Sequence, residues 1–155
     1  MAAYNAAMPA PALPDRSRRL RVIAAISGVY DALVGVVMLT AQGWLAVVFA
    51  VPLPRPPIHA DLNGVFLLAV ALGYLMPYRA PQQHRGYLWV MGVFLKGAGA
   101  LTFILDHLFR HSPPAFLLFA LSDGTLALVT LWALLTVPPP EASGAGASTA
   151  EYRPQ

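Results

Sequence analysis

Four long apolar stretches separated by proline-rich turns constrain this chain more than any other feature of its sequence. They cover about residues 20–41, 58–77, 86–108 and 115–137. An α-helix rises about 1.5 Å per residue, so about 20 apolar residues cross a hydrocarbon core of about 30 Å. Each stretch therefore predicts one transmembrane helix. We expect an all-α, multi-pass membrane protein folded as a single bundle of four transmembrane helices.

The amino-acid composition argues against a water-soluble globule. Hydrophobic residues make up 57% of the 155-residue chain and charged residues only 11%, whereas soluble domains contain about 25% charged residues. The sequence has no cysteine, which removes disulfides, thiolate metal sites and cysteine nucleophiles. The net charge of +3 is spread over the ends of the apolar stretches, so we expect no nucleic-acid partner.

The remaining segments predict tails and turns. Residues 1–19 and 138–155 are rich in Ala, Pro and Gly, which predicts disordered tails on either side of the 20–137 membrane domain. The first apolar stretch is longer than the apolar core of a signal peptide, so we interpret it as a membrane helix. Residues 44–51 are too few to cross a bilayer and fit a frayed end of the first helix or an interfacial segment. Pro77 is expected to end the second span.

The arginines predict the orientation. Four spans put both termini on one side of the membrane, and positive residues accumulate on the cytoplasmic side. Seven arginines lie on the side of the termini and two on the other, so we expect an inner-membrane protein with both termini in the cytoplasm. The seven are Arg16, Arg18, Arg19, Arg21, Arg79, Arg85 and Arg153, and the two are Arg55 and Arg110.

Three charged residues fall inside the spans, where each costs at least about 2.5–3.5 kcal/mol to insert. Helix rise puts Asp31, Lys96 and Asp123 about 15, 18 and 14 Å from the outer ends of their helices. They can therefore meet as a cluster of formal charge −1, with Ser27 and Asn63 as polar neighbours of a ligand-binding pocket. A structural ion pair that fixes helix register is the alternative explanation.

A second polar layer lies nearer the outer surface, at His59, Asp61, Asp106 and His107. Acidic residues near helix starts and basic residues near helix ends are favoured by the helix dipole, which explains them without a function. The functional interpretation makes them the vestibule of a cavity that leads down to the cluster. The spacing of these residues matches no metal-binding motif, so we expect no metal and no resident cofactor.

The segments YDALVGVVML (30–39), HADLNGVFLLAVALGYL (59–75), HRGYLWVMGVFLKGAGALTF (84–103) and SDGTLALVTLWALL (122–135) carry a resemblance. In layout over about 20–137 the chain resembles small bacterial four-helix inner-membrane proteins of the DoxX-like and BphX-like kind. The resemblance implies an accessory role beside redox enzymes. The cysteine pair of some redox-linked members has no counterpart here, and no catalytic residue is carried over.

Three function classes fit these observations. The leading one is a binding or accessory module that holds a lipophilic or amphiphilic ligand, such as a quinone, in the buried polar pocket. A dimeric, proton-coupled transporter is the second, with Asp31 or Asp123 exchanging the proton. An intramembrane acid–base enzyme such as an isomerase is the third. The expected partners are the bilayer, a lipophilic small molecule, and a second copy or a larger membrane complex.

Overall fold

The computed structural model describes residues 17–139, so most of each expected tail lies outside the described residues. Every regular element in the described part is a helix. Four helical segments are long and apolar enough to cross a membrane: Ser17–Thr40, Ile58–Arg79, Arg85–Arg110 and Pro114–Thr136. The expected all-α class with four membrane-spanning helices is therefore confirmed, and the chain is a multi-pass membrane protein.

The spans contain shorter elements within them. The first span is α1 (Ser17–Thr40), and α2 (Gln42–Val48) follows it as a separate short helix. The second span consists of α3 (Ile58–Gly73) and α4 (Leu75–Arg79). The third consists of α5 (Arg85–Tyr87), the π-helix η1 (Leu88–Leu95) and α6 (Lys96–Arg110), and the fourth of the 3-10 helix η2 (Pro114–Phe116) and α7 (Leu117–Thr136).

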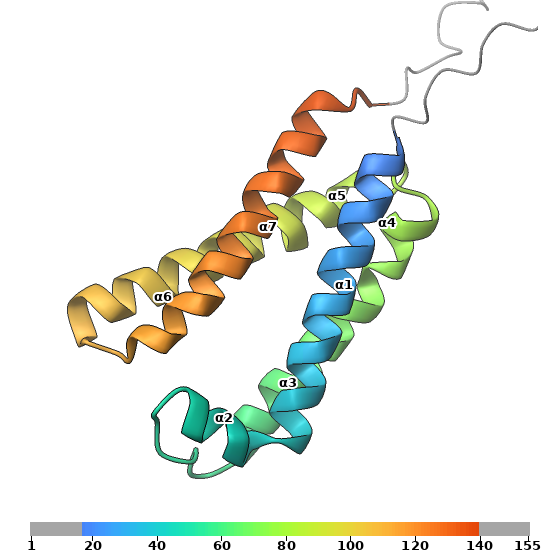
Figure 1. The fold of residues 1–155 in the computed structure, drawn as a ribbon. Helices are drawn as coiled ribbons and strands as arrows, with labels where there is room; N and C mark the ends of the chain where they lie inside the picture. Colours follow the sequence, from blue (N-terminus) through green and yellow to red (C-terminus); the bar gives the residue numbers. More distant parts are fainter. Residues whose placement is uncertain (1–16, 140–155) are drawn as a thin grey trace, which may run out of the picture.

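The four spans form two hairpins (Figure 1). In one hairpin α1 packs against α3 and α4, and in the other α7 packs against η1 and α6. The first and last described residues lie at the same end of the bundle, which we call the closed end. Toward the opposite end, the open end, the hairpins diverge and α2 lies between them.

The closed end holds the apolar core. Its buried side chains come from all four spans and include Leu20, Tyr74, Leu88, Ala133 and Leu134. Two arginines strengthen this end by linking its elements. The guanidinium of Arg19 lies 5.3 Å from the ring centre of Trp132, and Arg85 donates hydrogen bonds to the carbonyl oxygens of Leu134 and Val137 at 2.6 and 2.8 Å. Leu134 lies in the last turn of α7 and Val137 directly follows the helix, where carbonyl oxygens lack backbone donors within the helix.

The helix interruptions differ from the expected ones for a simple chemical reason. The second span continues through Pro77 to Arg79 and breaks instead at Tyr74. Proline lacks the amide hydrogen that would bond the carbonyl four residues earlier, so Pro77 disturbs the turn around Gly73 rather than its own position. The expected short segment at 44–51 is the helix α2, which Ala41 separates from α1.

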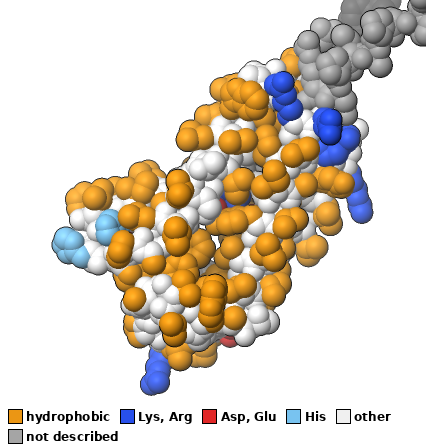
Figure 2. All heavy atoms as spheres, in the orientation of Figure 1, with side chains coloured by type: hydrophobic (Ala, Val, Ile, Leu, Met, Phe, Trp, Pro, Cys, Tyr) orange, Lys and Arg blue, Asp and Glu red, His pale blue; other side chains and the backbone are white. Residues whose placement is uncertain are grey.

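The outer surface matches a lipid environment. Large hydrophobic side chains are exposed on every span, among them Leu33, Leu72, Phe94 and Leu128 at 62, 66, 71 and 68%. Figure 2 shows apolar side chains spread over much of the visible face, with most of the visible Lys and Arg side chains near the closed end. A hydrophobic belt bounded by basic residues is typical of helices that cross a bilayer.

Candidate functional site

A buried ionic cluster lies between the two hairpins. The Nζ atom of Lys96 donates to Oδ1 of Asp31 at 2.6 Å and lies 3.1 Å from Oδ1 of Asp123. The side chains of Lys96 and Asp31 are only 5 and 3% exposed, whereas that of Asp123 is 18% exposed. The structure thus brings together the three charged residues that helix rise places at one depth. Because Asp31 belongs to one hairpin and Lys96 and Asp123 to the other, the cluster joins the hairpins.

The local backbone around Lys96 is irregular. Lys96 begins α6 directly after the π-helix η1, whose extra residue per turn changes the direction of the following side chains. Gly92 lies within η1, and a Cβ there would lie 2.8 Å from Cγ2 of Thr130 on α7. A glycine therefore allows close contact with α7 one turn before the lysine. π-Helical turns are frequent at functional sites, and nothing in the sequence pattern predicts this one.

Tyr30 and Ser122 form a second link between the hairpins that sequence reasoning missed. The Tyr30 hydroxyl hydrogen-bonds the Ser122 hydroxyl at 2.7 Å, and the Nζ atom of Lys96 lies 4.7 Å from the centre of the Tyr30 ring. The ring thus adds a cation–π contact to the two ion pairs. The sequence contains a signal for this link, because Tyr30 directly precedes Asp31 and Ser122 directly precedes Asp123, so both hydroxyl groups lie next to cluster residues.

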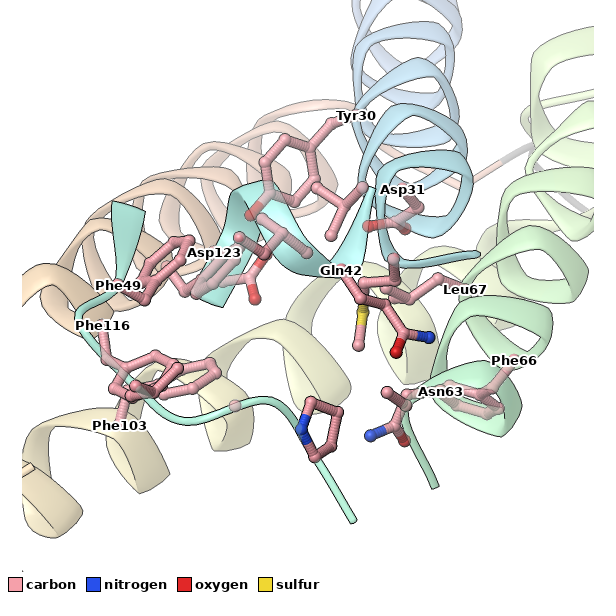
Figure 3. A pocket seen from close by; sticks show the side chains of 18 of the residues that line it. Tyr30, Asp31, Gln42, Phe49, Asn63, Phe66, Leu67, Phe103, Phe116 and Asp123 are labelled. Atoms are coloured by element: carbon pink, nitrogen blue, oxygen red, sulfur yellow. The ribbon is translucent and has the colours of Figure 1, made fainter. Parts of the chain in front are cut away.

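A cavity of about 630 Å³ opens beside the cluster, toward the open end. Figure 3 shows its two sides: rings of phenylalanine near Asp123, and the side-chain amides of Gln42 and Asn63 opposite them. The aromatic wall comprises Phe49, Phe103, Phe116 and Phe119, whose ring centres lie 5.0 to 6.1 Å apart in stacked pairs.

The aromatic wall also links the two hairpins at the open end. Phe49 follows α2 and stacks on Phe116 of η2 at 5.2 Å and on Phe119 of α7 at 5.0 Å. The segment that directly follows α2 therefore contacts the second hairpin. On its other side α2 is fixed by Gln42, whose Nε2 donates to Oδ1 of Asp61 on α3 at 2.6 Å. Thus α2 covers the open end and lines the cavity.

The two polar neighbours expected beside the cluster have different positions. Asn63 lines the cavity on the side opposite the aromatic wall. Ser27 is fully buried one turn below Asp31, toward the closed end, and does not line the cavity. Among the described residues, four buried side-chain oxygen atoms have no hydrogen-bond partner: Ser112 Oγ in the turn before η2, and Ser27 Oγ, Asp31 Oδ2 and Tyr74 Oη beside the cluster. Buried polar atoms are nearly always paired, so the three beside the cluster mark an unusual polar patch.

None of the four expected vestibule residues lines the cavity itself, although Asp61 is hydrogen-bonded to Gln42, which does. His59 is exposed in the first turn of α3, and the Asp61 carboxylate accepts the hydrogen bond from Gln42 described above. Neither residue is part of the cavity lining. Asp61 lies near a helix start, where a negative charge is favoured by the helix dipole, so its position has a structural explanation.

The other two members of that set lie at the end of α6. Asp106 pairs with Arg110 one turn further along the helix at 3.1 Å. His107 hydrogen-bonds through Nδ1 to the carbonyl oxygen of Ser112 at 2.7 Å and so closes the turn that follows. Both residues act locally, and neither lines the cavity. Within residues 17–139, His, Asp and Glu form no group of three or more that could hold a metal ion.

Comparisons with known proteins leave the site to be interpreted from its own chemistry. No family model, no curated protein and no solved structure matches this chain.

Proposed function

We propose that this protein is a binding or accessory module of the bacterial inner membrane, which holds a lipophilic or amphiphilic molecule in the cavity between its hairpins. The observation that carries the proposal is the cavity of about 630 Å³, whose lining is apolar except for the ionic cluster and a few polar side chains. Ligand sites of this size combine an apolar wall with a small number of placed polar groups. The layout-level resemblance to DoxX-like and BphX-like proteins supports the accessory role.

The shape of the site favours an amphiphile over a wholly polar solute. A polar head group fits at Asp123, the more exposed of the two carboxylates. A hydrocarbon or ring system fits along Phe103, Phe116 and Leu67, which line the same cavity. Such a molecule reaches the site from the bilayer, where it is already concentrated.

Filling the cavity tests the proposal. Gly99 lines the cavity, and a Cβ there would lie in ordinary contact, 3.7 Å from Oδ2 of Asp123. Gly99→Trp should therefore occupy the space where a ligand would lie. Ala98→Trp is the matched control, because Ala98 is the preceding residue on α6, is exposed and lies outside the lining.

The measurement is the ligand-induced rise in Tm of the purified full chain across a panel of quinones and long-chain alcohols, acids and amines. At least one class should stabilise the unchanged protein and the Ala98→Trp variant but not the Gly99→Trp variant. A panel that stabilises none of the proteins, or that stabilises the Gly99→Trp variant equally well, would contradict the proposal.

We extend the proposal to orientation, with the closed end at the cytoplasm. Five arginines of the described part lie at or near this end, whereas Arg55 lies in the turn after α2 and Arg110 is the last residue of α6, both toward the open end. Positive residues favour the cytoplasmic side. Because the chain has no cysteine, single-cysteine variants give a clean test. An impermeant maleimide added to intact spheroplasts should label Leu53→Cys and leave Gln83→Cys unlabelled; the reverse pattern would invert the orientation.

Proton-coupled transport is the second candidate, favoured by one observation. The buried polar atoms of Ser27, Asp31 and Tyr74 extend from the cluster toward the closed end, as a path across the membrane requires. A pH-driven flux in reconstituted vesicles that is lost in Asp31→Asn and kept in Asp106→Asn would favour this function. The acid–base enzyme has no such support, because His59 and Asp61 do not line the cavity with Asp123.

A further inference from the structure

The charge balance of the cavity specifies the ligand more closely than its apolar lining does. Among the residues that line the cavity, the charged ones are Asp31, Lys96 and Asp123. Two carboxylates face one ammonium, so the cluster has a formal charge of −1. An uncompensated charge inside a membrane is costly, and such charges are found paired. The site is therefore one positive charge short of balance.

The two carboxylates are not equally available to a ligand. Asp31 is 3% exposed and holds the shorter contact to Lys96, at 2.6 Å. Asp123 is 18% exposed, holds the longer contact at 3.1 Å, and points into the cavity in Figure 3. Lys96 is shared between the two carboxylates but lies closer to Asp31, so Asp123 is the carboxylate with the weaker pairing and the greater exposure to the cavity.

The surroundings of Asp123 also favour a cation. Phe119 and Phe116 precede it on the same face of the fourth span, one and about two turns away. Both rings line the cavity as members of the aromatic wall. Aromatic rings attract ammonium groups through their quadrupoles, and most strongly where water is excluded. Carboxylate and aromatic wall thus act on the same head group.

From this juxtaposition we infer that the cavity binds a cationic amphiphile, specifically a long-chain primary amine whose ammonium group pairs with Asp123 while its chain lies along the aromatic wall. This inference rests on the proposed binding function and adds the charge of the ligand. The ammonium donates to Asp123 in a charge-assisted hydrogen bond, which is stronger than the bond a neutral hydroxyl can make there. Lys96 disfavours the cation, but it is already shared between two carboxylates.

Three probes of equal chain length test the inference: dodecylamine, 1-dodecanol and dodecanoate. Their affinities are measured calorimetrically at pH 7 on the full chain in phosphatidylcholine nanodiscs, with empty nanodiscs subtracted. We expect dodecylamine to bind at least about tenfold more tightly than 1-dodecanol, the ratio that a charge-assisted hydrogen bond supports. Dodecanoate should bind most weakly, because it adds a second uncompensated negative charge.

Two variants assign the preference to its residues. Asp123→Asn leaves one ammonium and one carboxylate, a balanced pair, so it should fold and should lose the preference for the amine while keeping its affinity for 1-dodecanol. Asp106→Asn, at an acidic residue outside the cavity, should keep the preference. Phe119→Leu gives an independent reading, since loss of the aromatic face should weaken dodecylamine by about threefold relative to 1-dodecanol.

The outcomes separate this inference from the proposed function. If 1-dodecanol binds as tightly as dodecylamine, a proton rather than a ligand balances the cluster, and the inference is overturned while the binding function stands. Tightest binding of dodecanoate would assign head-group recognition to Lys96 and would overturn it as well. If none of the three probes binds, the inference is overturned, and the panel that includes quinones decides the proposed function. If Gly99→Trp leaves all affinities unchanged, the probes bind outside the cavity, and the proposed function falls together with the inference.

Discussion

The closed and open ends of the bundle use the same four spans in opposite ways. At the closed end Leu20, Leu88 and Ala133 are fully buried, and helices from both hairpins meet directly. At the open end the hairpins separate, and a cavity of about 630 Å³ remains between them. The charged residues lie where close packing gives way to the cavity. We therefore expect the closed end to supply most of the stability, whereas the open end contains the cavity that the proposed ligand would occupy.

The largest effect on stability is expected for a substitution in the ionic cluster, which lies at the boundary between the two ends. Lys96→Met removes the ammonium and leaves two carboxylates in a buried site, which should lower the free energy of unfolding by about 3–5 kcal/mol. Arg110→Met breaks an ion pair whose arginine is 83% exposed and should change stability by less than about 0.5 kcal/mol. Thermal unfolding in detergent measures both. Equal stability losses would mean that the cluster does not hold the hairpins together.

The same truncation at each end measures the difference in packing directly. Leu88→Ala at the closed end empties a site whose side chain is 0% exposed, and should cost about 2–5 kcal/mol. Leu67→Ala enlarges a cavity that Leu67 already lines, and should cost less than about 1 kcal/mol, because few contacts are lost. A larger loss for Leu67→Ala would reverse the assignment of stability to the closed end.

The arginine that ties the third span to the end of the fourth provides a polar test of the closed end. Arg85→Gln removes the guanidinium that bonds the carbonyl oxygens of Leu134 and Val137, which should cost about 1.5–3 kcal/mol. Arg79→Gln is the control, since it removes an exposed arginine at the same end of the bundle. Hydrogen exchange should show faster opening of the last turn of α7 in Arg85→Gln alone, and unchanged exchange there would contradict the capping role.

The smallest effect is expected for the hydroxyl link beside the cluster. Tyr30→Phe keeps the ring beside Lys96 but removes the hydrogen bond to Ser122, at a cost of about 0.5–1.5 kcal/mol. Ser122→Ala removes the same bond from the other side. In a double-mutant cycle the combined loss should be smaller than the sum of the two single losses. Strictly additive losses would show that the two hydroxyl groups have no favourable interaction with each other.

The fold could be predicted from the sequence because the constraints on membrane helices are local. Apolar length fixes a span, and the prolines that follow it mark the turn, so the four spans in the structure lie close to those expected. The meeting of Asp31, Lys96 and Asp123 also follows from local quantities, since helix rise alone places them at one depth. Buried charges then have few alternatives to pairing.

The other parts of the site depend on contacts between residues far apart in the chain, which local sequence patterns do not predict. The π-helix before Lys96 packs against α7, and Phe49 stacks on Phe116 and Phe119 of the other hairpin, so both features involve residues far apart in the chain. Helix dipoles and short-range hydrogen bonds account for Asp61 and His107, which were expected at a vestibule. Polar residues near helix ends have several nearby partners, so their sequence positions do not specify one cavity.

The pairing of Asp31 with Lys96 joins residues that are 65 positions apart in the chain, and this separation bears on biosynthesis. When the ribosome has delivered only the first hairpin to the bilayer, Asp31 lies in the membrane and the lysine that neutralises it has not yet been synthesised or inserted. An uncompensated acidic side chain favours escape from the lipid or a delay beside the insertion machinery. We therefore expect the first hairpin to reach its stable position in the membrane only after the second hairpin has inserted and Lys96 has paired with Asp31.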